Sequence, residues 1–97
     1  MKKESFEKFL SELSFKYSEN QIVKDMVLDA EDLAKYGEKR IALENLLENI
    51  YENEILISLK LIDIAEDAFS DTPNDYDNRI IDDLRQMIND KQNNSCS

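Results

Sequence analysis

The chain has 97 residues, a net charge of −10, one glycine and one proline. A chain of this length can bury one modest hydrophobic core, which argues against a large internal active site. Because sheet-rich domains need more turn residues than this, we predict an all-α fold, a single compact bundle of about five helices. We expect residues 1–91 to form one helical domain and the polar residues 92–97 to form a flexible tail.

The acidic balance also restricts the class of partner. Nucleic acids and anionic membranes are polyanions and repel such a chain, whereas a basic protein is attracted to it. Acidity can also serve only to keep a small protein in solution. No apolar run has the length of a membrane span or a signal peptide, and the single cysteine, Cys96, cannot form an internal disulfide. We therefore expect a cytoplasmic protein that binds neither nucleic acid nor membrane.

The first half of the chain predicts two amphipathic helices. The first spans about 3–17, because apolar residues recur there at helical spacing from Phe6 to Tyr17. The second runs to Tyr36, with Ser18 or Asn20 as its N-terminal cap. Gly37 follows where a helix commonly ends in a left-handed residue, a conformation that glycine adopts without strain.

Three more helices are predicted in the second half. One covers about 38–52, and one begins after a cap at Ser58 and ends before Ser70. The last begins at Thr72-Pro73-Asn74-Asp75, where threonine is the expected cap and proline the first helical residue. The connector 54–57 is expected to anchor itself to the core through Ile55 and Ile57.

The residues that most enzymes use are missing. The chain has no histidine, and its single glycine excludes a glycine-rich phosphate loop. Glu44 and Glu48 lie one helical turn apart, as in carboxylate metal sites, but those sites usually add a histidine from another helix. A solvated helix face explains them as well. We expect no enzymatic activity, no cofactor and no metal.

Acidic residues are densest between Asp63 and Asp83, where Arg79 is the one basic residue. Clustered like charges repel one another unless a partner neutralises them, and they speed association with a basic protein. Ordinary helix capping and solvation is the alternative, with Asp75 at a helix start and Asp82 paired to Arg79 or Arg85. The first-choice candidates for partner binding are Asp63, Glu66, Asp67, Asp71, Asp75 and Asp77. The second-choice candidates are Glu44, Glu48 and Tyr51, since an exposed tyrosine is a common interface anchor.

The segment from about 32 to 69 resembles the MafI-like immunity proteins that accompany contact-dependent growth inhibition toxins of bacteria. Members of that group show a helix patterned E-x-x-x-A-L-E-x-L-x-x-x-L-Y-E, a short extended turn ending in Ile-Ser, and a further helix. The residues that fit this pattern are Glu38, Ala42, Leu43, Glu44, Leu46, Ile50, Tyr51, Glu52, Ile57 and Ser58. They are mostly structural, so the resemblance assigns no binding residues.

What the resemblance implies is an antitoxin-like immunity protein that binds a cognate toxin domain, often a basic nuclease. On this reading the acidic surface covers the active cleft of the toxin. An acidic helical adaptor or regulator that sequesters another basic protein is the alternative. An enzyme or a carboxylate metalloprotein is the second rival. A DNA-binding helix-turn-helix is disfavoured, because acidic neighbours outweigh Lys39 and Arg40.

Overall fold

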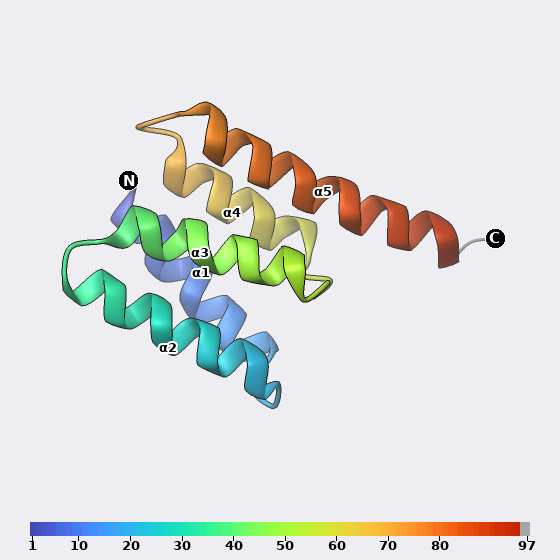
Figure 1. Cartoon of the computed structure of the whole chain (residues 1–97), viewed down its shortest axis with the longest axis horizontal. Coiled ribbons are helices and arrows are strands. Elements are labelled where there is room, and N and C mark those ends of the chain that lie inside the picture. Colours follow the sequence, from blue (N-terminus) through green and yellow to red (C-terminus); the bar gives the residue numbers. More distant parts are fainter. Residues whose placement is uncertain (96–97) are drawn as a thin grey trace.

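The computed structural model describes the backbone of residues 1–95 and the side chains of residues 1–92. This part of the chain contains five helices and no strand, which confirms the predicted all-α bundle (Figure 1). The helices are α1 (Lys3–Lys16), α2 (Gln21–Lys35), α3 (Lys39–Glu52), α4 (Leu59–Phe69) and α5 (Asp75–Ser95). None of them is long and apolar enough to cross a membrane.

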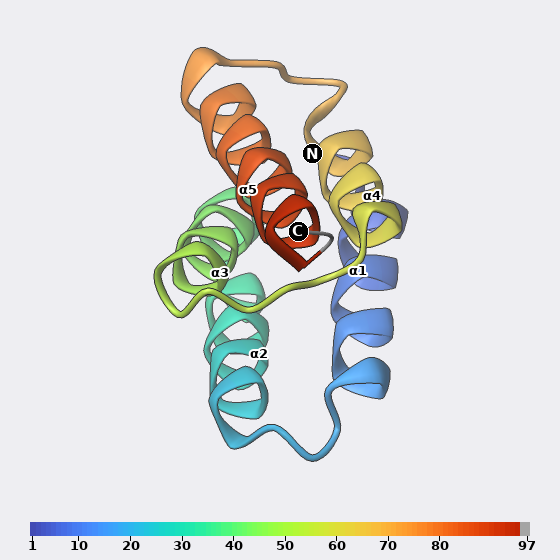
Figure 2. The same cartoon turned by 90° about the vertical axis from the view of Figure 1, so that its right-hand side faces the viewer.

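The helices pack as two pairs with α5 between them. α2 packs closely on α3, and α1 packs closely on α4, whereas the consecutive helices α1 and α2 touch little. Figure 2 shows α2 and α3 on one side, α1 and α4 on the other, and α5 against α3 and α4. The connection from α3 to α4 therefore crosses from one pair to the other, and Ile57 in this connection is buried.

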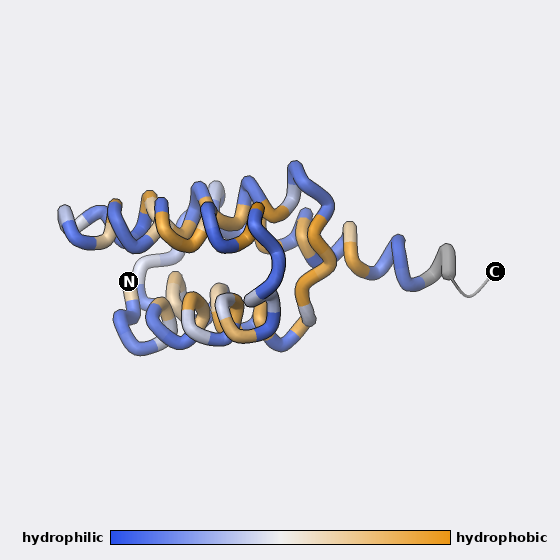
Figure 3. The backbone as a smooth tube through the Cα atoms, turned by 90° about the horizontal axis from the view of Figure 1, so that it is seen from below, coloured by the Kyte–Doolittle hydropathy of each residue, from blue (hydrophilic) through white to orange (hydrophobic). Residues whose placement is uncertain are grey.

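One continuous hydrophobic core joins all five helices. Figure 3 shows the apolar positions facing inward between the two layers and the polar positions facing outward. Such burial is the main favourable contribution to folding, at about 25 cal/mol per Å² of apolar surface. The largest fully buried side chains are Phe6, Phe9, Leu13, Val23, Leu43, Leu46, Leu47, Ile50, Ile57, Leu61, Ile62 and Leu84.

Three predicted helix ends are confirmed. The Asn20 side chain accepts a hydrogen bond from the Val23 amide at 3.2 Å, and Ser58 accepts one from the Leu61 amide at 3.2 Å. Gly37 has φ +80°, and its amide donates to the carbonyl oxygen of Ala34 at 3.0 Å. Each contact satisfies a backbone group that the helix itself leaves unpaired.

The start of α5 differs from the prediction. The Asn74 side chain, and not that of Thr72, accepts the hydrogen bond from the Asp77 amide, at 2.8 Å. Asn74 is therefore the cap, and the helix begins two residues later than the Thr-Pro signature suggests. The Thr72 hydroxyl instead accepts a hydrogen bond from Arg40 of α3, so a long-range contact replaces the local one.

The C-terminal end of α5 also extends further than predicted. The helix continues to Ser95 and projects beyond the other four helices (Figure 1). Among the side chains that the structure describes, Ile88 is the last buried residue of α5, and Lys91 beyond it pairs with Glu54 of the α3–α4 connection at 3.6 Å. Residues 96 and 97, the end of the predicted tail, lie outside the described residues.

Candidate protein-binding site

The first two predicted binding residues, Asp63 and Glu66, form an ion-pair network within the bundle. They lie on α4 and meet Arg85 of α5, which donates hydrogen bonds to Asp63 at 2.7 Å and to both Glu66 oxygens at 2.9 Å. These bonds from Arg85 are the largest cause that lowers the pKa of Glu66, and they raise that of the guanidinium. The network joins α4 to α5 and gives each carboxylate an internal partner, although the single Arg85 charge offsets only one of the two negative charges.

Asp67 and Asp71 are compensated by the N-terminal segment. Asp67 accepts hydrogen bonds from Ser5 at 2.5 Å and from the Lys2 ammonium at 3.3 Å. Asp71 pairs with the N-terminal ammonium of Met1 at 2.8 Å. The hydrogen bond from Ser5 is the largest cause that lowers the pKa of Asp67, and the bond from the N-terminal ammonium is the largest for Asp71. Both carboxylates are solvent-exposed and hold the N-terminus against the end of α4.

Asp75 and Asp77 have opposite environments. Asp75 is exposed in the first turn of α5 and forms no ion pair within residues 1–92. The Asp77 side chain is 1% exposed and pairs with Arg40, and it is the one charged side chain classed with the buried core within residues 1–92. The prediction that Asp77 presents its charge to a partner is therefore wrong, because the helix start places it inward against α3.

Arg40 organises the contact between α3 and α5. Its guanidinium donates to Asp77, to the Thr72 hydroxyl and, at 2.6 Å, to the Thr72 carbonyl oxygen. It also lies 5.4 Å from the ring centroid of Phe69, a cation–π distance. Glu44, one turn further along α3, lies 3.7 Å from its Nε atom and is only 18% exposed. Glu44 is thus part of this contact rather than of a free acidic face.

A group of unpaired acids that sequence analysis did not select lies on the outer side of the α2–α3 hairpin. Asp29 and Asp32 of α2 and Glu48 of α3 form no ion pair within residues 1–92. Together with Asn45 and Asn49 they line a groove of about 370 Å³ between the two helices, floored by Met26, Ala30, Leu33, Ala42 and Leu46.

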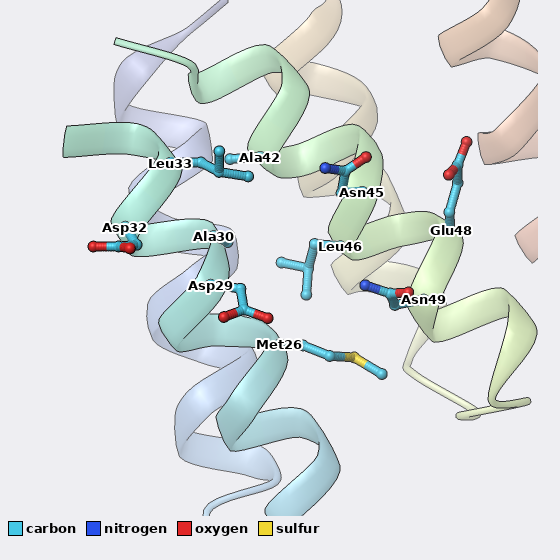
Figure 4. A pocket seen from close by; sticks show the side chains of 10 residues that line it. All are labelled: Met26, Asp29, Ala30, Asp32, Leu33, Ala42, Asn45, Leu46, Glu48 and Asn49. Carbon is cyan, nitrogen blue, oxygen red and sulfur yellow. The ribbon is translucent and has the colours of Figure 1, made fainter. Parts of the chain in front are cut away.

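Figure 4 shows how these side chains are directed. The Asp29 carboxylate points into the groove beside Leu46 and Met26, and the two asparagines project from α3 opposite it. Asp32 points away from α3, and Glu48 points away from α2, so these two acids flank the groove. The arrangement offers an apolar floor and acceptor oxygens with negative charge on both sides.

Exposed apolar side chains extend this surface toward Gly37. Tyr36, which shares the helical stripe of Asp29 and Asp32, is 80% exposed. Ile41, one turn before Asn45 and two before Glu48, is 45% exposed. An exposed tyrosine beside unpaired charges is typical of a protein–protein interface. We call this surface the acidic hairpin face, defined by Asp25, Asp29, Asp32, Tyr36, Ile41, Asn45, Glu48 and Glu52.

Of the candidates predicted from the sequence, Glu48 lies on this face, and Asp29 and Asp32 were not among those candidates. The position of the turn at Gly37 indicates which residues of the two helices face each other. Asp29 and Asn45 each lie eight residues from this turn, one on either side. In an antiparallel hairpin such residues lie opposite each other. Tyr51, the remaining candidate, is 41% exposed near the end of α3 and does not line the groove.

No group of acidic or cysteine side chains among the described residues has the arrangement of a metal site. Comparisons with protein families, curated proteins and solved structures give no match to this chain.

Proposed function

We propose that this protein is an immunity protein, which binds a basic toxin domain of bacterial origin, such as a nuclease, and blocks its active cleft. The acidic hairpin face is the observation that carries this proposal. Its acids form no ion pair with any described residue, whereas most of the other candidate acids are already paired. A protein that must attract a basic partner gains most from charges that remain unpaired.

The groove gives a physical basis for binding and not only for attraction. An arginine or lysine side chain could lay its aliphatic stem on Met26 and Leu46 and bring its charged head to Asp29. The oxygens of Asn45 and Asn49 would accept further hydrogen bonds from an arginine. Tyr36 and Ile41 add exposed apolar area, which nonspecific electrostatic attraction does not use.

The test uses the toxin domain encoded beside this gene and measures affinity and association rate by surface plasmon resonance. The wild-type protein should bind tightly, with an association rate that falls as salt is raised from about 20 mM to about 300 mM. Asp29→Lys should weaken binding by about tenfold or more, equivalent to about 1.4 kcal/mol.

Asp82→Lys is the matched control. It changes the net charge equally, but Asp82 lies on the exposed side of α5, which packs on α3 and α4 and not on α2. Equal losses in the two variants would show that only net charge matters. Absence of binding to the toxin domain would reject the immunity function. Co-purification with a different basic protein would then favour the adaptor or regulator.

A further inference from the structure

Buried groups at the contact between α3 and α5 point to a second property, which does not depend on the proposed function. Asp77 Oδ2 accepts the Arg40 hydrogen bond, whereas Asp77 Oδ1 is buried and has no donor among the described residues. An unsatisfied buried acceptor costs about 1–3 kcal/mol, so a donor is expected nearby. Glu44 belongs to the same cluster, because its carboxylate lies 3.7 Å from the Nε atom of the Arg40 that binds Asp77, and a carboxyl group is a donor only when protonated.

We propose that Glu44 keeps a proton that it donates to Asp77 Oδ1, and that this hydrogen bond completes the attachment of α5 to α3, so that raising the pH loosens it. With the proton present, Arg40 and the two carboxyl groups sum to zero charge in a largely buried site. Without it the site carries an uncompensated negative charge next to another carboxylate, and like charges this close resist joint ionisation.

The surroundings of Glu44 favour its protonated form. Burial is the largest cause that raises the pKa of Glu44 to about 7, followed by the hydrogen bond and charge of Asp77. On α3, Glu48 raises this pKa further and Arg40 lowers it. The loop before α5 brings Thr72, whose hydroxyl also accepts a hydrogen bond from the N-terminal ammonium, and α4 contributes the uncharged ring of Phe69.

The difference between the folded and the unfolded pKa of Glu44 decides whether stability rises or falls with pH. The folded pKa of Glu44 is raised from its ordinary value of 4.5, so over the interval up to about 7 the folded chain holds a proton that the unfolded chain has lost. The stabilisation is complete below the unfolded value and is lost as the pH rises through the folded one. The chain has no histidine, so few other groups titrate in this interval.

The experiment is urea unfolding of the full chain between about pH 5 and about pH 7. The wild-type midpoint should fall across this interval. In Glu44→Gln it should stay flat, because the neutral amide donates to Asp77 at every pH. Glu52→Gln is the matched control, because Glu52 is exposed on the same helix and is not among the groups that shift the pKa of Glu44, and it should keep the wild-type slope. Equal slopes in the wild type and Glu44→Gln would overturn the proposal.

A second measurement does not depend on how the variant folds. The side-chain carboxyl carbon of Glu44 should titrate near neutrality in the wild-type protein, as followed by ¹³C NMR. Titration at the ordinary glutamate value would overturn the proposal even if Glu44→Gln failed to fold.

Discussion

Individual charges in this protein are distinguished by their partners rather than by their position in the sequence. Asp75 and Asp77 are two residues apart on one helix, yet the first is exposed and the second is buried against Arg40. A buried ion pair adds little net stability, because both charges lose their hydration. Losing one member is costly, however, because it leaves the other charge uncompensated.

Asp77→Ala tests whether losing one member of the buried Arg40–Asp77 pair is costly. It removes the carboxylate that faces Arg40 and should lower the free energy of unfolding by about 3 kcal/mol. Asp82→Ala removes an exposed aspartate of the same helix and should change it by less than about 0.5 kcal/mol. Urea unfolding at neutral pH measures both. A similar small change in both variants would mean that the Arg40 contact does not hold α5 in place.

Among the helices, the α2–α3 hairpin is the unit that creates the candidate binding face. The turn at Gly37 sets the register in which Asp29 lies opposite Asn45, and it requires the left-handed conformation. The Glu38 amide then donates to the Leu33 carbonyl oxygen at 3.1 Å, which closes the end of α2.

Gly37→Ala should therefore destabilise the protein by about 1 kcal/mol. An added Cβ at this position would meet no atom within 4 Å, so the cost comes from the backbone conformation and not from a clash. Gly37→Asn should lose less, because asparagine tolerates the left-handed region better than alanine. Thermal or urea unfolding can rank the three proteins. If alanine and asparagine were equally tolerated, the turn would not depend on its positive φ.

At the scale of the whole molecule, the ionisable groups change the folding stability with pH in two opposite directions. Glu66, Asp67 and Asp71 have lowered pKa values because cationic or hydroxyl donors bind their charged forms. Their contribution is present above the ordinary carboxylate range and is lost as the pH falls through their folded values. The raised pKa of Glu44 acts in the opposite direction, since its contribution is lost as the pH rises toward about 7.

The stability of the whole chain should consequently be greatest at about pH 5 and fall on both sides. Thermal unfolding from about pH 3 to about pH 8 measures this profile. In Glu44→Gln the decline on the neutral side should disappear, while the acid side should remain. A wild-type profile that rises steadily to pH 8 would contradict this balance.

The sequence alone determined the all-α class, the approximate helix bounds and most helix ends, because these depend on local spacing and on hydrogen bonds between near neighbours. It also fixed the net charge of −10. It could not show which acids are compensated, because Arg85, Lys2 and the N-terminal ammonium reach their carboxylates only across the packed helices.

The tertiary structure alone decided the burial of Asp77 and the cap at Asn74. Arg40 of α3 donates hydrogen bonds to Thr72 and Asp77, which lie more than thirty positions later in the chain. Because Thr72 is bound to Arg40, Asn74 caps α5 in place of the threonine that the local Thr-Pro signature predicts. The same packing paired α2 with α3, so that Asp29, Asp32 and Glu48 came together around one groove, and none of them forms an ion pair within residues 1–92. Local patterns thus set the elements, and long-range packing decided which charges remain available to a partner.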